Sequence, residues 1–214
     1  MDPRHGLLKA SRTVFVRHGF RRTSMSMVAA EAGVTRQAIY HHFSSKEDLF
    51  SALVDDLQTQ ALEQAQRAAS QSASDGLARR LFRVMYAYHQ SLVASVAGSA
   101  FATELMEESS RHCAEVVAGH AKRFDAILVT VVDEAVNKRA FVLRERLKAQ
   151  ELVALVSMAA KGVKFAHAGS GERRYALALE HMIDIICAGA GCSLARLQQA
   201  EKPELKIVQK RGSK

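Results

Sequence analysis

The chain has 214 residues, of which 48% are hydrophobic and 24% charged, the balance of an ordinary globular protein. No apolar run reaches the roughly 18 residues of a membrane span, and the first residues lack the apolar core of a signal peptide. The three cysteines, Cys113, Cys187 and Cys192, are too sparse for a disulfide framework. These observations exclude membrane proteins and disulfide-rich secreted domains, and we expect a cytoplasmic protein that contacts no membrane.

The formal charge of +8 is unevenly distributed along the chain. Residues 1–46 hold eight Lys and Arg against two Asp and Glu, residues 47–200 hold 17 against 18, and residues 201–214 hold five against two. A small basic segment joined to a neutral body is typical of a polyanion-binding module, with nucleic acid as the leading candidate. Charge alone leaves open the alternative of a solvated basic surface.

Helical periodicity runs through most of the chain, and no strand alternation or internal repeat appears. The two prolines, Pro3 and Pro203, lie near the ends, so nothing between them removes a helix donor. The expected helices cover residues 7–18, 25–32, 36–43, 45–71, 75–96, 101–107, 109–137, 143–168 and 172–199. The sequence therefore predicts an all-α protein. A helix-turn-helix domain of three helices, residues 1–46, is fused to a larger helical ligand-binding and dimerisation domain, residues 47–200, and a basic tail, residues 201–214, follows.

Local signals mark the ends of the N-terminal helices. Gly19 and Gly33 supply left-handed stops for the first and second helix. Side-chain oxygens that can accept hydrogen bonds from free N–H groups precede the second, third and fourth helices. They belong to Thr23 or Ser24, to Thr35, and to Ser44 with Glu47 or Ser45 with Asp48.

The second and third helices are short, and the four residues between them, Ala-Gly-Val-Thr at 32–35, fit a helix-turn-helix. In such a unit the second of the two helices enters the major groove by its N-terminal end. Arg36 and Gln37 lie at that end, and because Arg pairs with guanine and Gln with adenine, we expect both to contact bases. Hydroxyl, phenol and ammonium groups suit phosphate contacts. They belong here to Thr23, Ser24, Thr35, Tyr40 and Lys46, although Tyr40 also suits a core position.

The segment 14–53, VFVRHGFRRTSMSMVAAEAGVTRQAIYHHFSSKEDLFSAL, resembles the TetR family of transcriptional regulators. The resemblance rests on the turn at Gly19-Phe20, the AGVT turn, the IYHHF segment and the SKEDL start of the fourth helix. It implies a homodimer whose N-terminal domain binds double-stranded operator DNA and whose larger domain binds a small-molecule effector and dimerises through its last two helices. By motif position it implies operator contacts from Thr35, Arg36, Gln37, Tyr40, His41 and Lys46. Met27 and Ala30 stand where the family usually has polar residues.

The helix expected over residues 75–96 is apolar on nearly all sides, which indicates burial inside the body. Its surplus apolar face meets either further core packing or a ligand cavity, and both interpretations stay open. Candidate ligand-binding residues on this and neighbouring helices are Met85, Tyr88, His89, Met106, His120, Phe124, Met158 and Phe165. Tyr88, His89 and His120 would orient a ligand, although His120 also suits a satisfied core histidine.

The last helix carries a broad apolar face, followed by small residues that would let a partner helix approach closely. We therefore expect the dimer interface on this helix and the one before it. The expected interface residues are Tyr175, Leu179, Met182, Ile183 and Ile186.

The function predicted from these features is a DNA-binding repressor, released from a palindromic operator by a small, largely apolar ligand. A ligand-responsive activator or a non-regulatory architectural DNA-binding protein is the alternative. No nucleophile elbow, metalloprotease motif, phosphate-binding glycine loop or CxxC motif occurs, so we expect neither an enzyme nor a cofactor. His41 and His42 diverge by about 100° on a helix and do not suit one metal ion.

Overall fold

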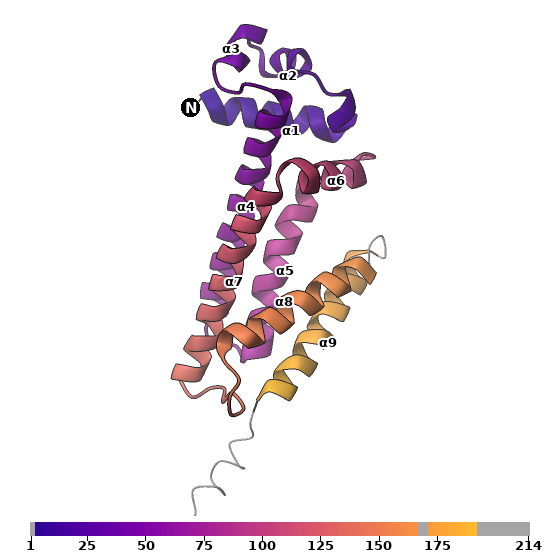
Figure 1. The fold of residues 1–214 in the computed structure, drawn as a ribbon. Coiled ribbons are helices and arrows are strands. Elements are labelled where there is room, and N and C mark those ends of the chain that lie inside the picture. Colours follow the sequence, from indigo (N-terminus) through magenta and orange to yellow (C-terminus); the bar gives the residue numbers. More distant parts are fainter. Residues whose placement is uncertain (1–2, 167–170, 192–214) are drawn as a thin grey trace, which may run out of the picture.

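The computed structural model describes residues 3–166 and 171–191, and this part of the chain folds into nine α-helices without a strand. The N-terminal helices form a head at one end of a body made of the remaining helices (Figure 1). The head comprises α1 (Pro3–Arg22), α2 (Met25–Ala32) and α3 (Arg36–Tyr40). The body comprises α4 (Lys46–Gln71), α5 (Leu77–Ser95), α6 (Ala102–His112), α7 (Ala114–Asn137), α8 (Ala149–Ala166) and α9 (Glu172–Ala190). The all-α prediction, with a three-helix N-terminal unit on a larger helical body, is confirmed.

The second, third and fourth helices begin at hydroxyl residues. Side-chain oxygens of Ser24, Thr35 and Ser45 accept hydrogen bonds from the backbone N–H groups three residues further on, at 3.3, 3.2 and 3.0 Å. Asp48 completes the cap of α4, because its carboxylate accepts the N–H of Ser44 at 2.8 Å. These bonds satisfy donors that a helix N-terminus otherwise leaves free.

Several helix ends differ from the sequence-based expectation. The chain does not leave α1 at Gly19 but bends there, with φ 75° and ψ 173°, and continues to the end of the helix. Helix α6 is longer than expected and takes the first turn predicted for α7. Helix α8 begins six residues late, after a loop in which Arg146 has a φ of 71° and Glu151 caps the N–H of Lys148 at 2.8 Å. Residues 192–199 of the last predicted helix lie outside the described residues.

One apolar cluster fills the head. The Phe50 ring lies 5.0 Å from that of Phe15 and 4.9 Å from that of Phe20, between centroids, and Ile39 of α3 is fully buried. The cluster continues along the first turns of α4 and into α6 through Leu105. Residues of α4 therefore pack in both the head and the body, and α6 packs against the side of the head that faces the body.

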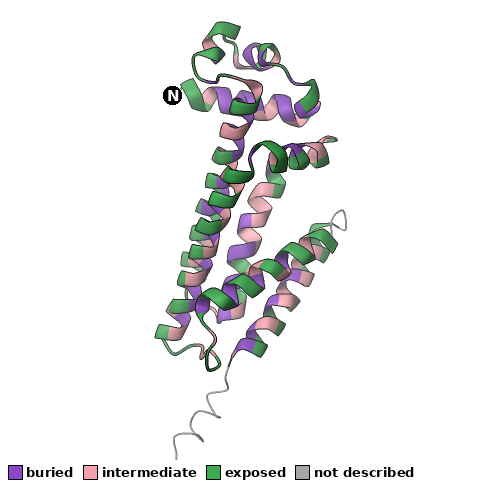
Figure 2. Cartoon of the chain, in the orientation of Figure 1, coloured by how far each residue is buried: buried purple, intermediate pink, exposed green. Residues whose placement is uncertain are grey.

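A second apolar cluster fills the body between α4, α5, α7, α8 and α9. Helices α8 and α9 pack together at its edge, and both carry exposed stripes (Figure 2). The exposed large apolar residues of these two helices are Leu155, Met158, Phe165, Leu177 and Ile185. None of the described helices is both long and apolar enough to cross a membrane.

Candidate nucleic-acid interface and ligand cavity

Helix α3 presents most of its side chains to solvent. Ile39 holds it to the head, whereas Arg36, Gln37, Tyr40 and the following His41 are exposed. The guanidinium of Arg36 donates a 3.4 Å hydrogen bond to the Tyr40 hydroxyl and lies 5.5 Å from the centroid of its ring. This contact between residues four apart orders a long cationic side chain at the start of an exposed helix.

The residues predicted for phosphate contact fall into two groups. Ser24 and Thr35 are exposed at the starts of α2 and α3. Thr23, in contrast, is 3% exposed and donates its hydroxyl to the backbone carbonyl four residues earlier at 2.6 Å, so its side chain is not on the expected surface. The ammonium of Lys46 donates to the carbonyl of Phe20 at 3.0 Å and lies over that ring. Thr23 and Lys46 therefore stabilise the turn at the end of α1.

Helix α6 holds the end of α1 through two carboxylates. Glu104 Oε1 accepts a hydrogen bond from the backbone N–H of Arg21 at 2.8 Å, and Glu108 Oε1 accepts one from the Nε of the same residue at 3.1 Å. Arg111 and His112 also lie within 3.3 and 3.2 Å of Glu108. Burial raises the pKa of Glu108, but the hydrogen bond from Arg21 and the neighbouring positive charges outweigh it, so the pKa lies below its ordinary value. The ionised carboxylate thus ties the head to the body.

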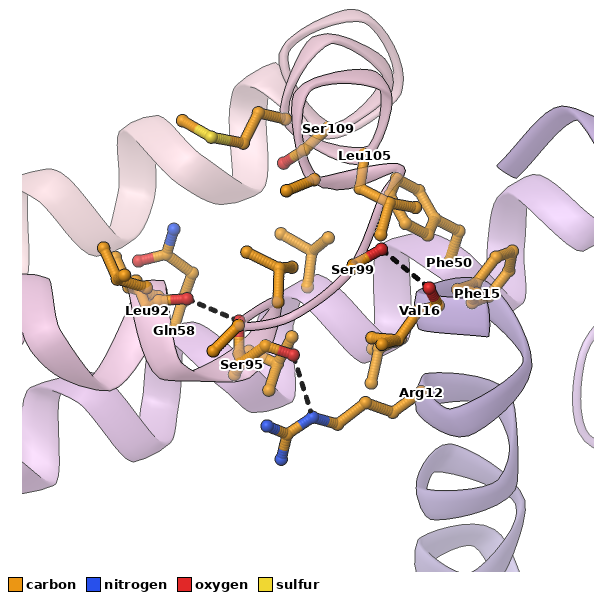
Figure 3. A pocket seen from close by; sticks show the side chains of 18 of the residues that line it. Arg12, Phe15, Val16, Phe50, Gln58, Leu92, Ser95, Ser99, Leu105 and Ser109 are labelled. Atoms are coloured by element: carbon orange, nitrogen blue, oxygen red, sulfur yellow. Dashed lines mark hydrogen bonds between the residues drawn. The ribbon is translucent and has the colours of Figure 1, made fainter. Parts of the chain in front are cut away.

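An apolar cavity of about 490 Å³ lies between the head and the body (Figure 3). Its wall is shared by α1, α4, α5, α6, α7 and α8 and by the segment between α5 and α6. The large apolar residues in the wall are Phe15, Val16, Phe50, Leu53, Val54, Leu57, Leu92, Val93, Val96, Leu105, Met106 and Val117. This volume falls in the range of roughly 300–1,000 Å³ that small-molecule sites occupy.

Two side chains in the cavity wall join α1 to the end of α5 (Figure 3). Arg12 donates from Nε to the carbonyl of Ser95 at 3.2 Å and from Nη2 to that of Ala94 at 3.3 Å. The hydroxyl of Ser99 donates to the carbonyl of Val16 at 2.6 Å. These hydrogen bonds hold α1, a helix of the head, against the part of the body that lines the cavity.

The far end of the cavity is more polar. Gln58 Oε1 accepts a 2.6 Å hydrogen bond from the hydroxyl of Tyr88, and Lys164 of α8 also belongs to the cavity wall. Burial lowers the pKa of Lys164. Burial, and then the charge of Lys164, lower the pKa of His89 to about 4, while its Nδ1 contacts the hydroxyl of Tyr175.

Most residues predicted for a ligand pocket lie elsewhere. Met106 does line the cavity. Tyr88 and Phe124 stack in the body core with their ring centroids 4.0 Å apart, and Met85 is fully buried beside them. His89, a residue of α5, contacts the hydroxyl of Tyr175 on α9. The cavity lies nearer the head than predicted, because α1 and α6 shape it.

His120, Met158 and Phe165 complete that predicted set, and none of the three lines the cavity. His120 is 3% exposed, and its Nε2 lies 2.7 Å from Oδ1 of Asp55 on α4. This placement favours the core-histidine interpretation. Met158 and Phe165 are 61% and 87% exposed on the outer face of α8.

The predicted dimer residues of α9 face the protomer's own core. Leu179 and Ile183 are fully buried there, and Tyr175, Met182 and Ile186 pack partly against it. The apolar side chains that α9 exposes are instead Leu177 and Ile185.

The thiols and the metal-binding residue types offer no further site in the described ranges. Cys113 and Cys187 are buried free thiols, and burial raises the pKa of both, to about 11 for Cys187, where the charge of Asp184 adds to the effect. A thiol with a raised pKa is a poor redox sensor. Cys192 lies outside the described residues. Within residues 3–166 and 171–191, no three His, Cys, Asp or Glu side chains gather as a metal site would require.

Arg12, Glu104, Glu108 and Lys164 are the residues that sequence reasoning missed. Charged residues spaced four apart on a short helix, as Glu104 and Glu108 are, usually mark a solvated face. Arg12 contributed only to the count of basic residues in the head. Arg12, Glu104 and Glu108 have hydrogen-bond partners in other helices, and Lys164 lines a cavity that several helices form. The periodicity of a sequence does not reveal which helices pack together.

Comparison with known proteins gives matches over the head and over the whole fold. Residues 7–53 match the family model described as bacterial regulatory proteins, tetR family. The chain is 41% identical over 56 residues to the HTH-type transcriptional regulator TtgR of Pseudomonas putida, covering 26% of this chain and 27% of that protein. It is 38% identical over 74 residues to the HTH-type transcriptional repressor AcnR of Corynebacterium diphtheriae, covering 35% of each. The chain thus matches about a third or less of the length of these relatives.

The structure of SmeT, the repressor of the Stenotrophomonas maltophilia multidrug efflux pump SmeDEF, superposes with a TM-score of 0.64. The two share 21% identity, and the match covers 89% of this chain and 91% of that one, which is a likeness of fold. The fold and the exposed α3 define a helix-turn-helix protein with a large helical body. Residues 7–53 of the chain are thus similar to the N-terminal part of TetR-family proteins, and the relatives matched there are named as regulators of transcription.

Proposed function

We propose that the protein is a dimeric repressor of transcription, whose two heads bind a palindromic operator and release it when a small, largely apolar molecule fills the cavity. The observation that carries this proposal is the exposed α3, which presents Arg36 and Gln37 at its N-terminal end on a basic head. The names of AcnR and SmeT, both repressors, favour repression as the outcome.

The exposed groups suit two kinds of DNA contact. Arg36 and Gln37 have the donor and acceptor patterns that read guanine and adenine. Ser24, Thr35 and Tyr40 carry exposed hydroxyls that suit phosphates, and His41 stands beside them. Because the Lys46 ammonium donates one of its three hydrogens to a carbonyl, it keeps two for a phosphate.

The exposed apolar residues of α8 and α9 support dimerisation. Leu155, Met158 and Phe165 share one face of α8, since their spacing repeats at helical period. Ile185, 73% exposed, and Leu177 lie on α9. Two such helix pairs, related by a two-fold axis, would bury these faces in a four-helix bundle and separate the heads to reach successive major grooves about 34–36 Å apart.

The position of the cavity supports coupling between ligand and DNA. Phe15 and Val16 of α1 belong to its wall, and α6 contributes Leu105 to the cavity while Glu104 holds α1. A ligand that moves either helix alters the position of the head. Ligand and DNA then weaken each other by the same coupling free energy, typically about 1–3 kcal/mol.

The test is selection of DNA from a random-sequence duplex pool with the full-length protein, followed by titration of the recovered site at fixed salt. We expect an inverted repeat bound about 10³-fold or more tighter than random duplex. Equal affinity for both would identify an architectural DNA-binding protein, and no binding to either would refute the proposal. A reporter gene placed behind the recovered site then separates a repressor from an activator by the sign of its response.

A further inference from the structure

We propose that the cavity between head and body binds an amphipathic anion, an aliphatic or aromatic carboxylate, with the carboxylate at Lys164 and the apolar part extended along α4 toward the head. The inference rests on the proposed function in one respect, which is that binding of the anion releases DNA. The binding step itself requires no DNA.

The charges in the cavity wall carry the argument. The lining side chains include Arg12 and Lys164 but no Asp or Glu. The guanidinium of Arg12 is already bonded to two carbonyls at the C-terminal end of α5, where the helix dipole favours a cation. Lys164 forms no hydrogen bond or ion pair with any residue of 3–166 or 171–191. The wall thus holds no counter-ion for either cation, and Lys164 is the one that also has no hydrogen-bond acceptor among the described residues.

The neighbours of Lys164 also favour an anion. The Oε1 of Gln58 is occupied by the hydroxyl of Tyr88, which leaves the amide N–H₂ as the group to meet a ligand. Lys164 belongs to the same cavity wall as Gln58, and its charge acts on His89, the residue after Tyr88. The wall thus offers two donors, the Gln58 amide and the Lys164 ammonium, to a carboxylate, which is an acceptor with two oxygens.

Toward the head the wall is mostly apolar, and the guanidinium of Arg12 there is bonded to the carbonyls of Ser95 and Ala94. Along α4 the wall runs from Phe50 through Leu53, Val54 and Leu57 before it reaches Gln58, a rise of about 12 Å at 1.5 Å per residue. Phe15 and Leu105 close this end beneath the head. The wall is thus apolar along α4, and Lys164 is the cation in it that has no partner among the described residues, which matches a molecule with one charged end and one apolar end.

The experiment is isothermal titration calorimetry of the full-length protein without DNA, using three probes that share a ten-carbon chain, each below its micellar or solubility limit. Decanoate, 1-decanol and decyltrimethylammonium differ in the charge of the head group. We expect decanoate to bind about tenfold or more tighter than the other two, the size of a charge-assisted hydrogen bond in a partly buried site. Equal affinity for the three probes, or no binding of decanoate, would overturn the proposal.

Variants at α8 assign the preference to one residue. Lys164→Met should weaken decanoate by about tenfold and leave 1-decanol unchanged, whereas Lys164→Arg should retain the preference. Lys161→Met, at an exposed position one turn earlier, is the matched control and should bind decanoate as wild type does. Unchanged decanoate affinity in Lys164→Met would contradict the assignment. Leu57→Trp should weaken all three probes because the larger side chain takes up cavity volume.

A parallel titration of the selected operator separates the two proposals. If decanoate binds selectively but the protein shows no preference for any DNA, the proposed function fails and the cavity assignment stands. If operator binding is specific but decanoate binding is absent or indifferent to the head group, the cavity assignment fails alone.

Discussion

The backbone N–H of Arg21, two residues beyond the bend of α1 at Gly19, donates a 2.8 Å hydrogen bond to Oε1 of Glu104 on α6. The next residue of α6, Leu105, is part of the cavity wall. Glu104, which holds the end of α1, is therefore adjacent in sequence to Leu105, whose side chain a ligand in the cavity would contact. Helix α6 therefore joins the cavity wall to the end of α1.

Glu104→Ala should weaken that connection. The substitution removes the acceptor of the Arg21 N–H, and we expect a loss of about 1 kcal/mol in the free energy of unfolding. Operator affinity without ligand should be retained, while the decrease in affinity that the ligand causes should shrink. Glu107→Ala, exposed on the same helix, is the control. Urea unfolding and operator titrations with and without ligand measure both effects, and an undiminished ligand response would argue against transmission through Glu104.

Gly19→Ala tests the bend itself. With φ 75° and ψ 173°, Gly19 occupies a region that is essentially restricted to glycine, so a side chain costs about 1–3 kcal/mol from backbone strain. An added Cβ would also lie 2.9 Å from both Glu104 Oε1 and Phe101 Cδ1. Gly119→Ala, within α7 and with open space around it, should instead stabilise the protein by roughly 0.5–1 kcal/mol. Equal stability of the two variants would show that the bend carries no strain.

His89 should make stability depend on pH. Its pKa is lowered from 6.5 to about 4, chiefly by burial and further by Lys164. Below pH 6.5 the His89 imidazole is therefore protonated in the unfolded chain, whereas it stays neutral in the folded protein down to about pH 4. The free energy of unfolding consequently falls as the pH falls. The expected loss between pH 7 and pH 5 is about 2 kcal/mol. His89→Gln should flatten this part of the profile, whereas His181→Gln, at an exposed position, should not. Parallel profiles for the wild type and His89→Gln would contradict the assignment.

Ile185→Asp should separate the proposed dimer. Ile185 is 73% exposed in the protomer, so a carboxylate there leaves the fold intact but places an unpaired charge in the interface. Sedimentation should show monomers with unchanged thermal stability and weak operator binding. Ile186→Asp, at a half-buried neighbour that packs on the body core, should instead lower the melting temperature. A dimer that survives Ile185→Asp would place the interface elsewhere.

The parts of the fold that could be predicted are those that local chemistry decides. Ser24, Thr35 and Ser45 cap their helices because a hydroxyl before a helix has one favourable partner, the N–H three residues on. The exposure of Arg36 follows from the burial of Ile39 in a helix of only five residues. Both conclusions need no knowledge of distant contacts.

The inner face of α9 and the cavity depend on distant contacts. Helix α9 is apolar on both sides, with Leu179 and Ile183 on one and Ile185 on the other, and periodicity does not show which side meets the body. The cavity forms where Arg12 and Lys164, more than 150 residues apart by number, approach one space from opposite ends. Such a space is a property of the assembled helices.

The central claim is sequence-specific DNA recognition by α3, and a fluorescence-anisotropy titration of the Arg36→Ala variant tests it most directly. The selected operator and a scrambled duplex of equal length and composition are compared for wild type and variant at one salt concentration. Arg36→Ala should lose about 1–3 kcal/mol of binding free energy on the operator and much less on the scrambled duplex. Equal losses on the two duplexes, or no loss on either, would contradict the assignment of Arg36 to base recognition.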